Sequence, residues 1–452
     1  RADRVYRNRL HSVSREYRAG LKSFSEEEIM TGIQKKQRLL TMIFGAFAIF
    51  FTGYPHVWSI YQPYVMEQAG WSQGQASMCF YLALSTFVFG NIVGGRMQNR
   101  FKEKTIVWIG GGIFAAGILA SAFLIVPTPL PMYLSYGVMQ GFGQGMIYTV
   151  ILATVQRWFP DRTGFASGVV VTANGLCGFF LAPLSRKLLE AEGVQKTFLI
   201  IGAAIAVSWI LCGIFFQAPD KSLVNAGGSA AKSGTSEMKQ YTSGEMMRTR
   251  NFYLLLATMF FGLISYFMVS PVSQTYQIDL GIPSAVAVSA VMLGSIVNAG
   301  ARLVLPTLAD KVGRIVCIKG VLIVAVIAMG VLAVSRSLAV TVAVVLMYGC
   351  YGGIMGSFPS LTSSIFGMKH TGENYGFVMF GIVFATFGAP AISGLVSSKG
   401  YEMNVVFGIG AVFAVIAFVC LTLLGQNLVK EHAEKSAGVK NDTAQVSKPQ
   451  AE

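Results

Sequence analysis

The sequence predicts an all-α membrane protein whose twelve transmembrane helices form two six-helix bundles. Its 452 residues are 53% hydrophobic and only 12% charged, a composition outside the range of soluble globular domains. The apolar residues gather in twelve stretches, each long enough to cross a bilayer. A polar, Gly/Ser-rich segment at 218–250 divides the stretches six and six. Such a composition is typical of a flexible linker between two halves.

Each predicted span is an apolar run that ends at charged or turn-forming residues. The N-terminal half, 39–217, holds spans at 39–66, 75–97, 105–126, 132–155, 163–185 and 197–217. The C-terminal half, 251–425, holds spans at 251–273, 284–307, 315–334, 339–365, 373–396 and 402–425. The remaining segments, 1–38 and 426–452, are polar and are expected to form tails.

The formal net charge of +14 comes from an uneven distribution of 35 Lys and Arg residues. The two tails, the linker and the connections after even-numbered spans carry 29 of them, and the connections after odd-numbered spans carry 5. This asymmetry predicts that both termini and the linker lie in the cytoplasm, with the protein in the inner (plasma) membrane. The basic charge is therefore expected to face anionic lipid headgroups, and no nucleic-acid partner is expected.

Two pairs of motifs indicate a duplicated six-helix unit. The pattern Thr163-Gly164-x-x-x-Gly168 recurs as Thr371-Gly372-x-x-x-Gly376, an offset of 208 residues. The basic connection GGRMQNRFKEK precedes the connection LPTLADKVGRI by 211 residues. Duplicated units of this kind are typical of transporters that rock two bundles about a central site.

Arg302 is the one charge in the middle of an apolar span, and that span holds no carboxylate. It lies eight residues before Asp310, or ~12 Å along a helix, which is close to the midplane of a bilayer with a half-thickness of ~15 Å. A cation there costs roughly 2.5–3.5 kcal/mol and needs a partner or a water-filled cavity. An anion that binds and leaves is the favoured partner. A structural role, with backbone carbonyls as partners, is the alternative.

The connection after the eighth span resembles the signature G-x-x-x-D-[RK]-x-G-[RK] of the major facilitator superfamily. The matching residues are Asp310, Lys311, Gly313 and Arg314. Pro306 replaces the first glycine, and the copy after the second span has Asn99 in place of the aspartate. We expect Asp310 to cap a neighbouring helix and to pair with a base across the bundle, so that the motif latches one conformation.

Within that superfamily, residues 39–425 resemble the oxalate/formate antiporter family and its monocarboxylate-transporter relatives. The resemblance rests on four motifs: YPHVWSIYQP in the first span, YGVMQGFGQGMIYTVILATVQRWFPDR in the fourth, N-x-x-x-R at Asn298 and Arg302, and YGGIMGSFPSLTSSIFGMKHTGENYG from the tenth into the eleventh. Carriers of this family bind a small carboxylate in a central cavity and expose it to each side of the membrane in turn.

The resemblance implies a set of substrate-binding residues. They are Arg302, Asn298, Tyr148, His56, Trp58, Tyr348 and Tyr351. Arg302 would pair with the substrate carboxylate through its planar guanidinium, and the aromatic residues would form the cavity walls. Tyr148 follows a face of Gly137, Gly141 and Gly145, which predicts close helix packing.

Three departures from the family pattern narrow the expected substrate. Relatives specialised for dicarboxylates carry a lysine in the eleventh span, but none lies between Lys369 and Lys399. Proton-coupled animal relatives have an aspartate where this chain has Asn298, and many relatives have a tyrosine where it has His56. One cation balances one carboxylate, so the pattern favours a monocarboxylate such as formate, acetate, lactate or pyruvate. His56 is expected to donate to the substrate, to titrate or to serve packing.

The alternatives are an oxalate/formate-type anion exchanger, a carrier of a sulfonate, aromatic acid or drug, and a non-transporting receptor. The chain has no G-x-x-x-x-G-K-[ST] or H-E-x-x-H motif, so we expect no enzyme activity, no cofactor and no metal. The expected partners are a small organic anion and membrane lipids, with the monomer as the functional unit.

Overall fold

The computed structural model describes residues 32–219 and 239–446, and the regular structure in these ranges is helical throughout. Eleven of the described helices are long and apolar enough to cross a membrane. The longest, α9 (Thr163–Phe215), contains two helices that meet at Gly193, where a φ of 76° interrupts the helical backbone. Because α9 supplies two spans, the eleven helices correspond to the twelve predicted apolar spans, and the prediction is confirmed.

The N-terminal half consists of α3 (Gly32–Phe51), η1 (Tyr54–Val57), α4 (Trp58–Ala69), α5 (Gln73–Met97), α6 (Glu103–Ser121), α7 (Leu130–Met132), η2 (Tyr133–Gln140), α8 (Gly141–Trp158), η3 (Pro160–Arg162) and α9. The first span is broken at η1, where Pro55 occupies the start of a 3₁₀ turn. The fourth span includes η2, a π-helical stretch of eight residues, and such wide turns are frequent at functional sites.

The C-terminal half consists of α11 (Ser243–Met247), α12 (Arg250–Val269), η4 (Ser270–Val272), α13 (Ser273–Asp279), α14 (Ser284–Val312), α15 (Arg314–Val334), α16 (Ala339–Phe366), α17 (Thr371–Val378), α18 (Phe380–Ser398) and α19 (Met403–Val446). Here η4 and α13 extend the seventh span beyond its Pro271, and α17 and α18 together make the eleventh. Helix α19 continues past the predicted end of the last span at residue 425.

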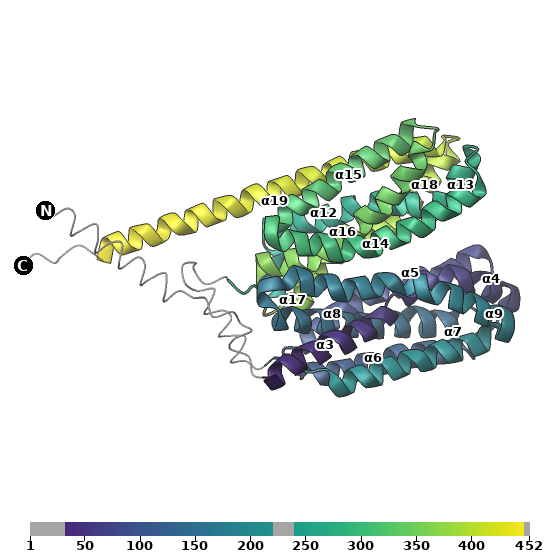
Figure 1. Cartoon of the computed structure of the whole chain (residues 1–452), viewed down its shortest axis with the longest axis horizontal. Helices are drawn as coiled ribbons and strands as arrows, with labels where there is room; N and C mark the ends of the chain where they lie inside the picture. The colour runs from purple at the N-terminus through teal and green to yellow at the C-terminus, as the bar shows by residue number, and fades with distance from the viewer. Residues whose placement is uncertain (1–31, 220–238, 447–452) are drawn as a thin grey trace, which may run out of the picture.

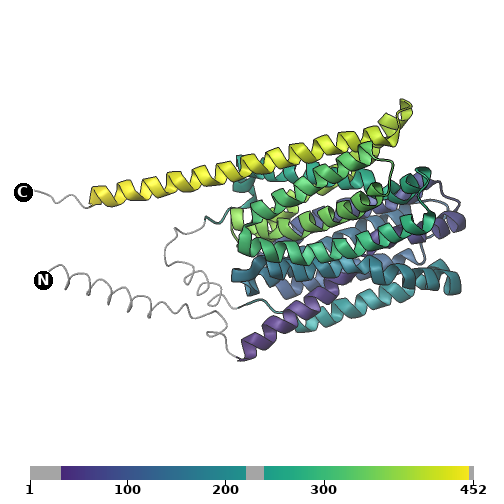
Figure 2. The ribbon, with the colours of Figure 1, turned by 45° about the horizontal axis from the view of Figure 1, so that its top comes forward.

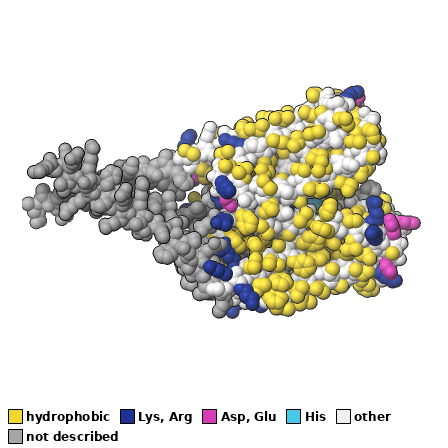
Figure 3. All heavy atoms as spheres, viewed as in Figure 1, with side chains coloured by type: hydrophobic (Ala, Val, Ile, Leu, Met, Phe, Trp, Pro, Cys, Tyr) yellow, Lys and Arg dark blue, Asp and Glu magenta, His cyan; other side chains and the backbone are white. Residues whose placement is uncertain are grey.

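The two halves lie side by side, and the start of α3 and the far end of α19 point to the same side of the molecule (Figures 1 and 2). We call this side the basic end, because Arg96 at the end of α5, Arg157 at the end of α8 and Arg314 at the start of α15 lie there. A band of hydrophobic side chains covers the visible surface between the two ends (Figure 3). The exposed hydrophobic residues include large side chains that are about 60% exposed, such as Met292 and Val316. An apolar outer surface of this kind fits a lipid environment and a multi-pass membrane protein.

Small residues bring the backbones of neighbouring helices together. A side chain at Gly145 of α8 would collide with the backbone oxygen of Phe87 on α5, and one at Gly141 would meet Ala83. The predicted glycine face therefore packs α8 against α5.

Candidate functional site

Arg302 of α14 is buried between the two halves, with 2% of its surface exposed. Its Nε donates to Asn298 Oδ1 one turn earlier on α14, at 3.1 Å. Its Nη1 donates to two acceptors on α9, Asn174 Oδ1 at 2.8 Å and the Val171 carbonyl at 3.3 Å. Gly175 leaves room for this approach, because a Cβ there would lie 3.0 Å from Arg302 Cδ.

The charge of Arg302 has no carboxylate partner in the part of the chain that the structure describes. The ion pairs found there involve other basic residues. An amide or carbonyl oxygen satisfies the guanidinium N–H groups, but it does not cancel the charge. The carbonyl partner of the structural alternative is thus present at Val171, yet the site retains a net positive charge.

Three tyrosines of the C-terminal half form an aromatic wall beside Arg302. The Tyr351 ring centroid lies 5.3 Å from Arg302 Cζ, in cation–π range. Tyr266 of α12 stacks on Tyr351 with ring centroids 4.2 Å apart, and Tyr348 meets Tyr266 edge to face at 5.3 Å. The Tyr348 hydroxyl lies 3.4 Å from Ser273 Oγ. These rings exclude water on that side and strengthen electrostatic interactions of the guanidinium.

His56 and Tyr148 approach the same centre from the N-terminal half. Both lie close enough to Arg302 to interact with its charge, as does Tyr375 of α17. Tyr148 is buried against Phe87, with ring centroids 5.2 Å apart. The Tyr375 side chain is buried, with 1% of its surface exposed. His56 is exposed, and its ring lies 6.1 Å from that of Phe80.

Trp58 lies apart from this group, inside the N-terminal half. Its indole N–H donates to the Ala76 carbonyl at 3.0 Å, and its ring packs 4.4 Å from that of Tyr136. These contacts occupy the only polar group of its side chain. The structure thus gathers six of the seven predicted residues around or beside the Arg302 centre and places Trp58 in the packing of the bundle.

Sequence reasoning missed Asn174, Gly175, Tyr266 and Tyr375. Asn174 could have been predicted, because it is an amide in the middle of the apolar run VVVTANGLCG, and polar groups inside spans are commonly functional. Tyr266 and Tyr375 could not have been predicted, since the sequence does not distinguish a tyrosine that lines a central site from one that anchors a span at the membrane surface.

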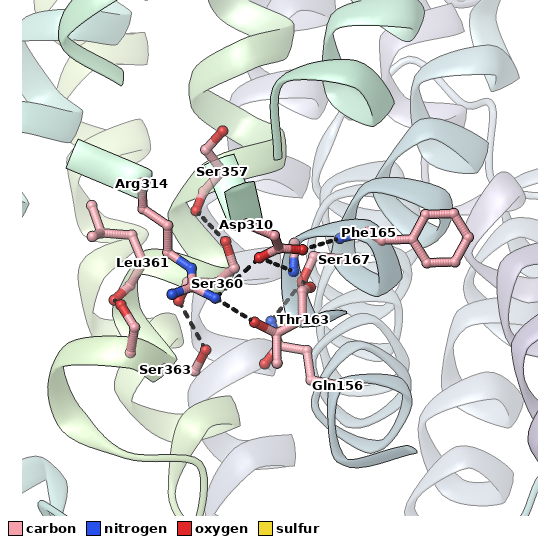
Figure 4. A network of polar contacts seen from close by, with 12 residues as sticks. Gln156, Thr163, Phe165, Ser167, Asp310, Arg314, Ser357, Ser360, Leu361 and Ser363 are labelled. Atoms are coloured by element: carbon pink, nitrogen blue, oxygen red, sulfur yellow. Dashed lines mark hydrogen bonds and ion pairs between the residues drawn. The ribbon is translucent and has the colours of Figure 1, made fainter. Parts of the chain in front are cut away.

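Asp310 ties the two halves together at the basic end (Figure 4). Its Oδ1 accepts from the Gly164 backbone N–H at 3.1 Å and its Oδ2 from that of Phe165 at 3.0 Å, so it caps the start of α9. Arg314 donates to Asp310 Oδ1 at 3.1 Å and to Thr163 Oγ1 at 2.9 Å. Asp310 caps a neighbouring helix as expected, and this helix belongs to the other half. The predicted pairing with a base across the bundle is wrong in one respect, because Arg314 follows one turn later in the same half.

The other two residues of the motif have simpler positions. Gly313 has a φ of 98°, which L side chains rarely adopt, and it separates α14 from α15. Lys311 is exposed at the basic end.

A second tie, which the sequence did not reveal, joins α5 of the N-terminal half to α17 of the C-terminal half. Arg96 Nε, at the end of α5, lies 2.6 Å from Glu373 Oε1 in the first turn of α17. Beside it, Thr149 Oγ1 of α8 donates to the Gly372 carbonyl at 2.9 Å. Gly95 allows α5 and α17 to come this close, because a side chain at Gly95 would collide with the Glu373 backbone.

Several side-chain hydrogen bonds join the two halves within residues 32–219 and 239–446, within about one helical turn of Arg302 or nearer the basic end. They join Arg96 to Glu373, Thr149 to Gly372, Asp310 to Gly164 and Phe165, Arg314 to Thr163, Thr172 to the Ala299 carbonyl, and Arg302 to Val171 and Asn174. The halves are therefore held closed at the basic end.

Comparison with known proteins gives a consistent result. Residues 40–386 match the family model described as Major Facilitator Superfamily. An uncharacterized MFS-type transporter YhjX of Escherichia coli (strain K12) is 28% identical over 77% of this chain and 85% of its own length. An oxalate:formate antiporter of Oxalobacter formigenes is 26% identical over 82% of this chain and 88% of its own. Human monocarboxylate transporter 11 is 28% identical over 51% of this chain and 47% of its own.

Solved structures resemble the fold. The Major Facilitator Superfamily transporter FucP in the outward conformation superimposes with a TM-score of 0.67, covering 86% of this chain and 99% of FucP at 14% identity. A bacterial homologue of the iron transporter ferroportin in an outward-facing state gives a TM-score of 0.66 over the same shares at 13% identity. The family model, which covers more than half of the chain, and the two-bundle fold agree. The chain is a multi-pass membrane transporter that belongs to the Major Facilitator Superfamily.

Proposed function

We propose that this protein carries small monocarboxylates of the formate, acetate, lactate or pyruvate class by alternating access. The carboxylate would bind Arg302 at the interface of the two halves. The printed functions of two relatives, an oxalate:formate antiporter and a monocarboxylate transporter, support an organic anion as the substrate class.

The observation that carries this proposal is a buried guanidinium without a counter-charge. Arg302 is 2% exposed, is held only by neutral groups, and lies where the two halves meet. Its planar fork matches a carboxylate through two parallel hydrogen bonds. A bound anion would therefore neutralise the charge and contact both halves at once.

A single negative charge on the substrate fits the site best. Helix α18 contains no Lys or Arg between Phe380 and Ser398, so a second carboxylate would enter a desolvated site without a second cation. The runner-up is exchange of oxalate for formate, which the similarity to the Oxalobacter formigenes antiporter favours.

We further propose that the basic end faces the cytoplasm of the inner (plasma) membrane, following the excess of Lys and Arg there. The ties at that end would then close the cytoplasmic side, and the exposed His56 would face an outward-open space. Substrate would enter from outside in this conformation.

Uptake by purified protein in liposomes tests the proposal. Arg302→Ala and Arg302→Lys should each lose at least about tenfold in uptake of labelled lactate or acetate, because a hydrogen bond to a charged group contributes about 1.5–3 kcal/mol. Arg336→Ala is the matched control, since Arg336 pairs with Glu402 at an exposed position and both side chains are 72% exposed. Uptake at the wild-type rate by Arg302→Ala would refute the proposal.

Competition by unlabelled anions separates the two candidates. Formate, acetate, lactate and pyruvate should compete better than oxalate or malonate. If oxalate competes best, the oxalate-type exchange is the correct function.

A further inference from the structure

Asn174 is the side chain of the N-terminal half that reaches the guanidinium of Arg302. Its Oδ1 lies 2.8 Å from Arg302 Nη1, the shortest of the hydrogen bonds that the guanidinium makes. The bond joins α9 to α14 and therefore crosses between the halves. Asn298, by contrast, lies on the same helix as Arg302.

The orientation of the Asn174 amide is determined by a second hydrogen bond. Its Nδ2 donates to Thr52 Oγ1 at 3.0 Å. The Thr52 hydroxyl gives its own proton to the Ile49 carbonyl, at 2.6 Å, so it can only accept from Asn174. Thr52 is 1% exposed, so bulk water does not compete for this hydrogen bond. The amide oxygen is thus held toward Arg302.

We propose that Asn174 occupies the place of a substrate oxygen in the empty transporter and ties the halves together there. This inference rests on the proposed pairing of Arg302 with a carboxylate. Nη1 of Arg302 donates to Asn174 and to the Val171 carbonyl, and Nε donates to Asn298. An anion that takes over the Nη1 N–H bonded to Asn174 therefore displaces that amide. Displacement removes one hydrogen bond between the halves and links substrate binding to their separation.

Two substitutions at this position have opposite expected effects. Asn174→Ala removes the competing acceptor, and the expected Kd for a monocarboxylate is about three- to tenfold lower, somewhat less than the full strength of a charge-assisted hydrogen bond because water partly replaces the amide. Asn174→Asp places a permanent carboxylate beside Arg302. It should raise the melting temperature of the ligand-free protein, because a buried cation gains a counter-charge, and weaken monocarboxylate binding more than tenfold.

The test uses the purified full chain in lipid nanodiscs. Melting temperatures are measured without ligand and with sodium formate, acetate, lactate or pyruvate, and the Kd of the anion that stabilises the wild type most is measured by calorimetry. Asn251→Ala is the matched control, because this buried amide binds Glu431 instead. It should leave the Kd unchanged.

The outcomes distinguish this inference from the proposed function. If Arg302→Ala binds the anion as tightly as the wild type, the proposed function fails. If Arg302→Ala abolishes binding but Asn174→Ala leaves the Kd unchanged or raises it, only the role of Asn174 fails. A ligand-free Asn174→Asp protein that melts below the wild type also overturns that role, without reference to any substrate.

Discussion

Glu373 of α17 and Arg96 of α5 form an ion pair of 2.6 Å between the two halves of the molecule. Its position resembles that of the Asp310 cap on α9, since Thr371 and Gly372 open α17 as Thr163 and Gly164 open α9. The two ties differ in chemistry. The C-terminal half contributes the carboxylate to both. Asp310 caps a helix of the other half, whereas Glu373 lies in the first turn of its own helix, α17, where the helix N-terminus favours negative charge.

We expect Glu373→Gln to loosen the basic end while changing overall stability by no more than about 1 kcal/mol, because Arg96 is 61% exposed and its pairing is screened by water. A cysteine placed at Thr149, which is buried beside this tie, should react faster with a small maleimide in the Glu373→Gln background. Glu402→Gln, which breaks an exposed pair with Arg336, is the control. Equal alkylation rates in all backgrounds would contradict a closing role.

Asp310→Ala should cost about 1–2 kcal/mol, the usual value of a lost helix cap, and should reduce uptake by favouring opening at the basic end. Asp310→Asn should fall between the alanine variant and the wild type, because an amide oxygen accepts one N–H but carries no charge. Thermal melting and liposome uptake measure the two effects. Asp279→Ala, at an exposed helix end, should change neither. Uptake preserved in Asp310→Ala would rule out the latch.

Gly175→Ala should reduce uptake by about tenfold, because the added Cβ would lie 3.0 Å from Arg302 Cδ and 3.1 Å from its Nε and would displace the guanidinium. Gly178→Ala is a close control on the same helix, since no heavy atom lies within 4 Å of a Cβ there. Initial rates of uptake in liposomes compare the two. Similar rates for both variants would mean that the position of the guanidinium is not critical.

The proposed orientation predicts opposite labelling of two exposed lysine positions. In intact cells, a membrane-impermeant thiol reagent should label Lys399→Cys and should leave Lys369→Cys unlabelled until the membrane is permeabilised. The two sites follow α18 and α16 on opposite sides of the predicted eleventh span. The reverse pattern would invert the topology.

Much of the architecture could be predicted from the sequence, because it depends on quantities that a sequence contains directly. Span length follows from the thickness of the bilayer. The division into two six-helix halves followed from the position of the polar segment at 218–250. Arg302 stood out because a lone charge in an apolar run is costly wherever the run packs, and Asp310 because its motif is local. The glycine face of α8 was likewise visible as a repeat of every fourth residue.

Which residues meet across the interface was decided by the tertiary structure alone. Lipid tails and neighbouring helices are similarly apolar, so hydropathy does not tell which face of a span turns inward. Trp58 was therefore expected in the central site, yet it packs against Tyr136. Asn174 lies 128 residues before Arg302 in the chain. Glu373 lies 277 residues after Arg96. Only the docking of one bundle on the other brings these pairs within hydrogen-bond distance.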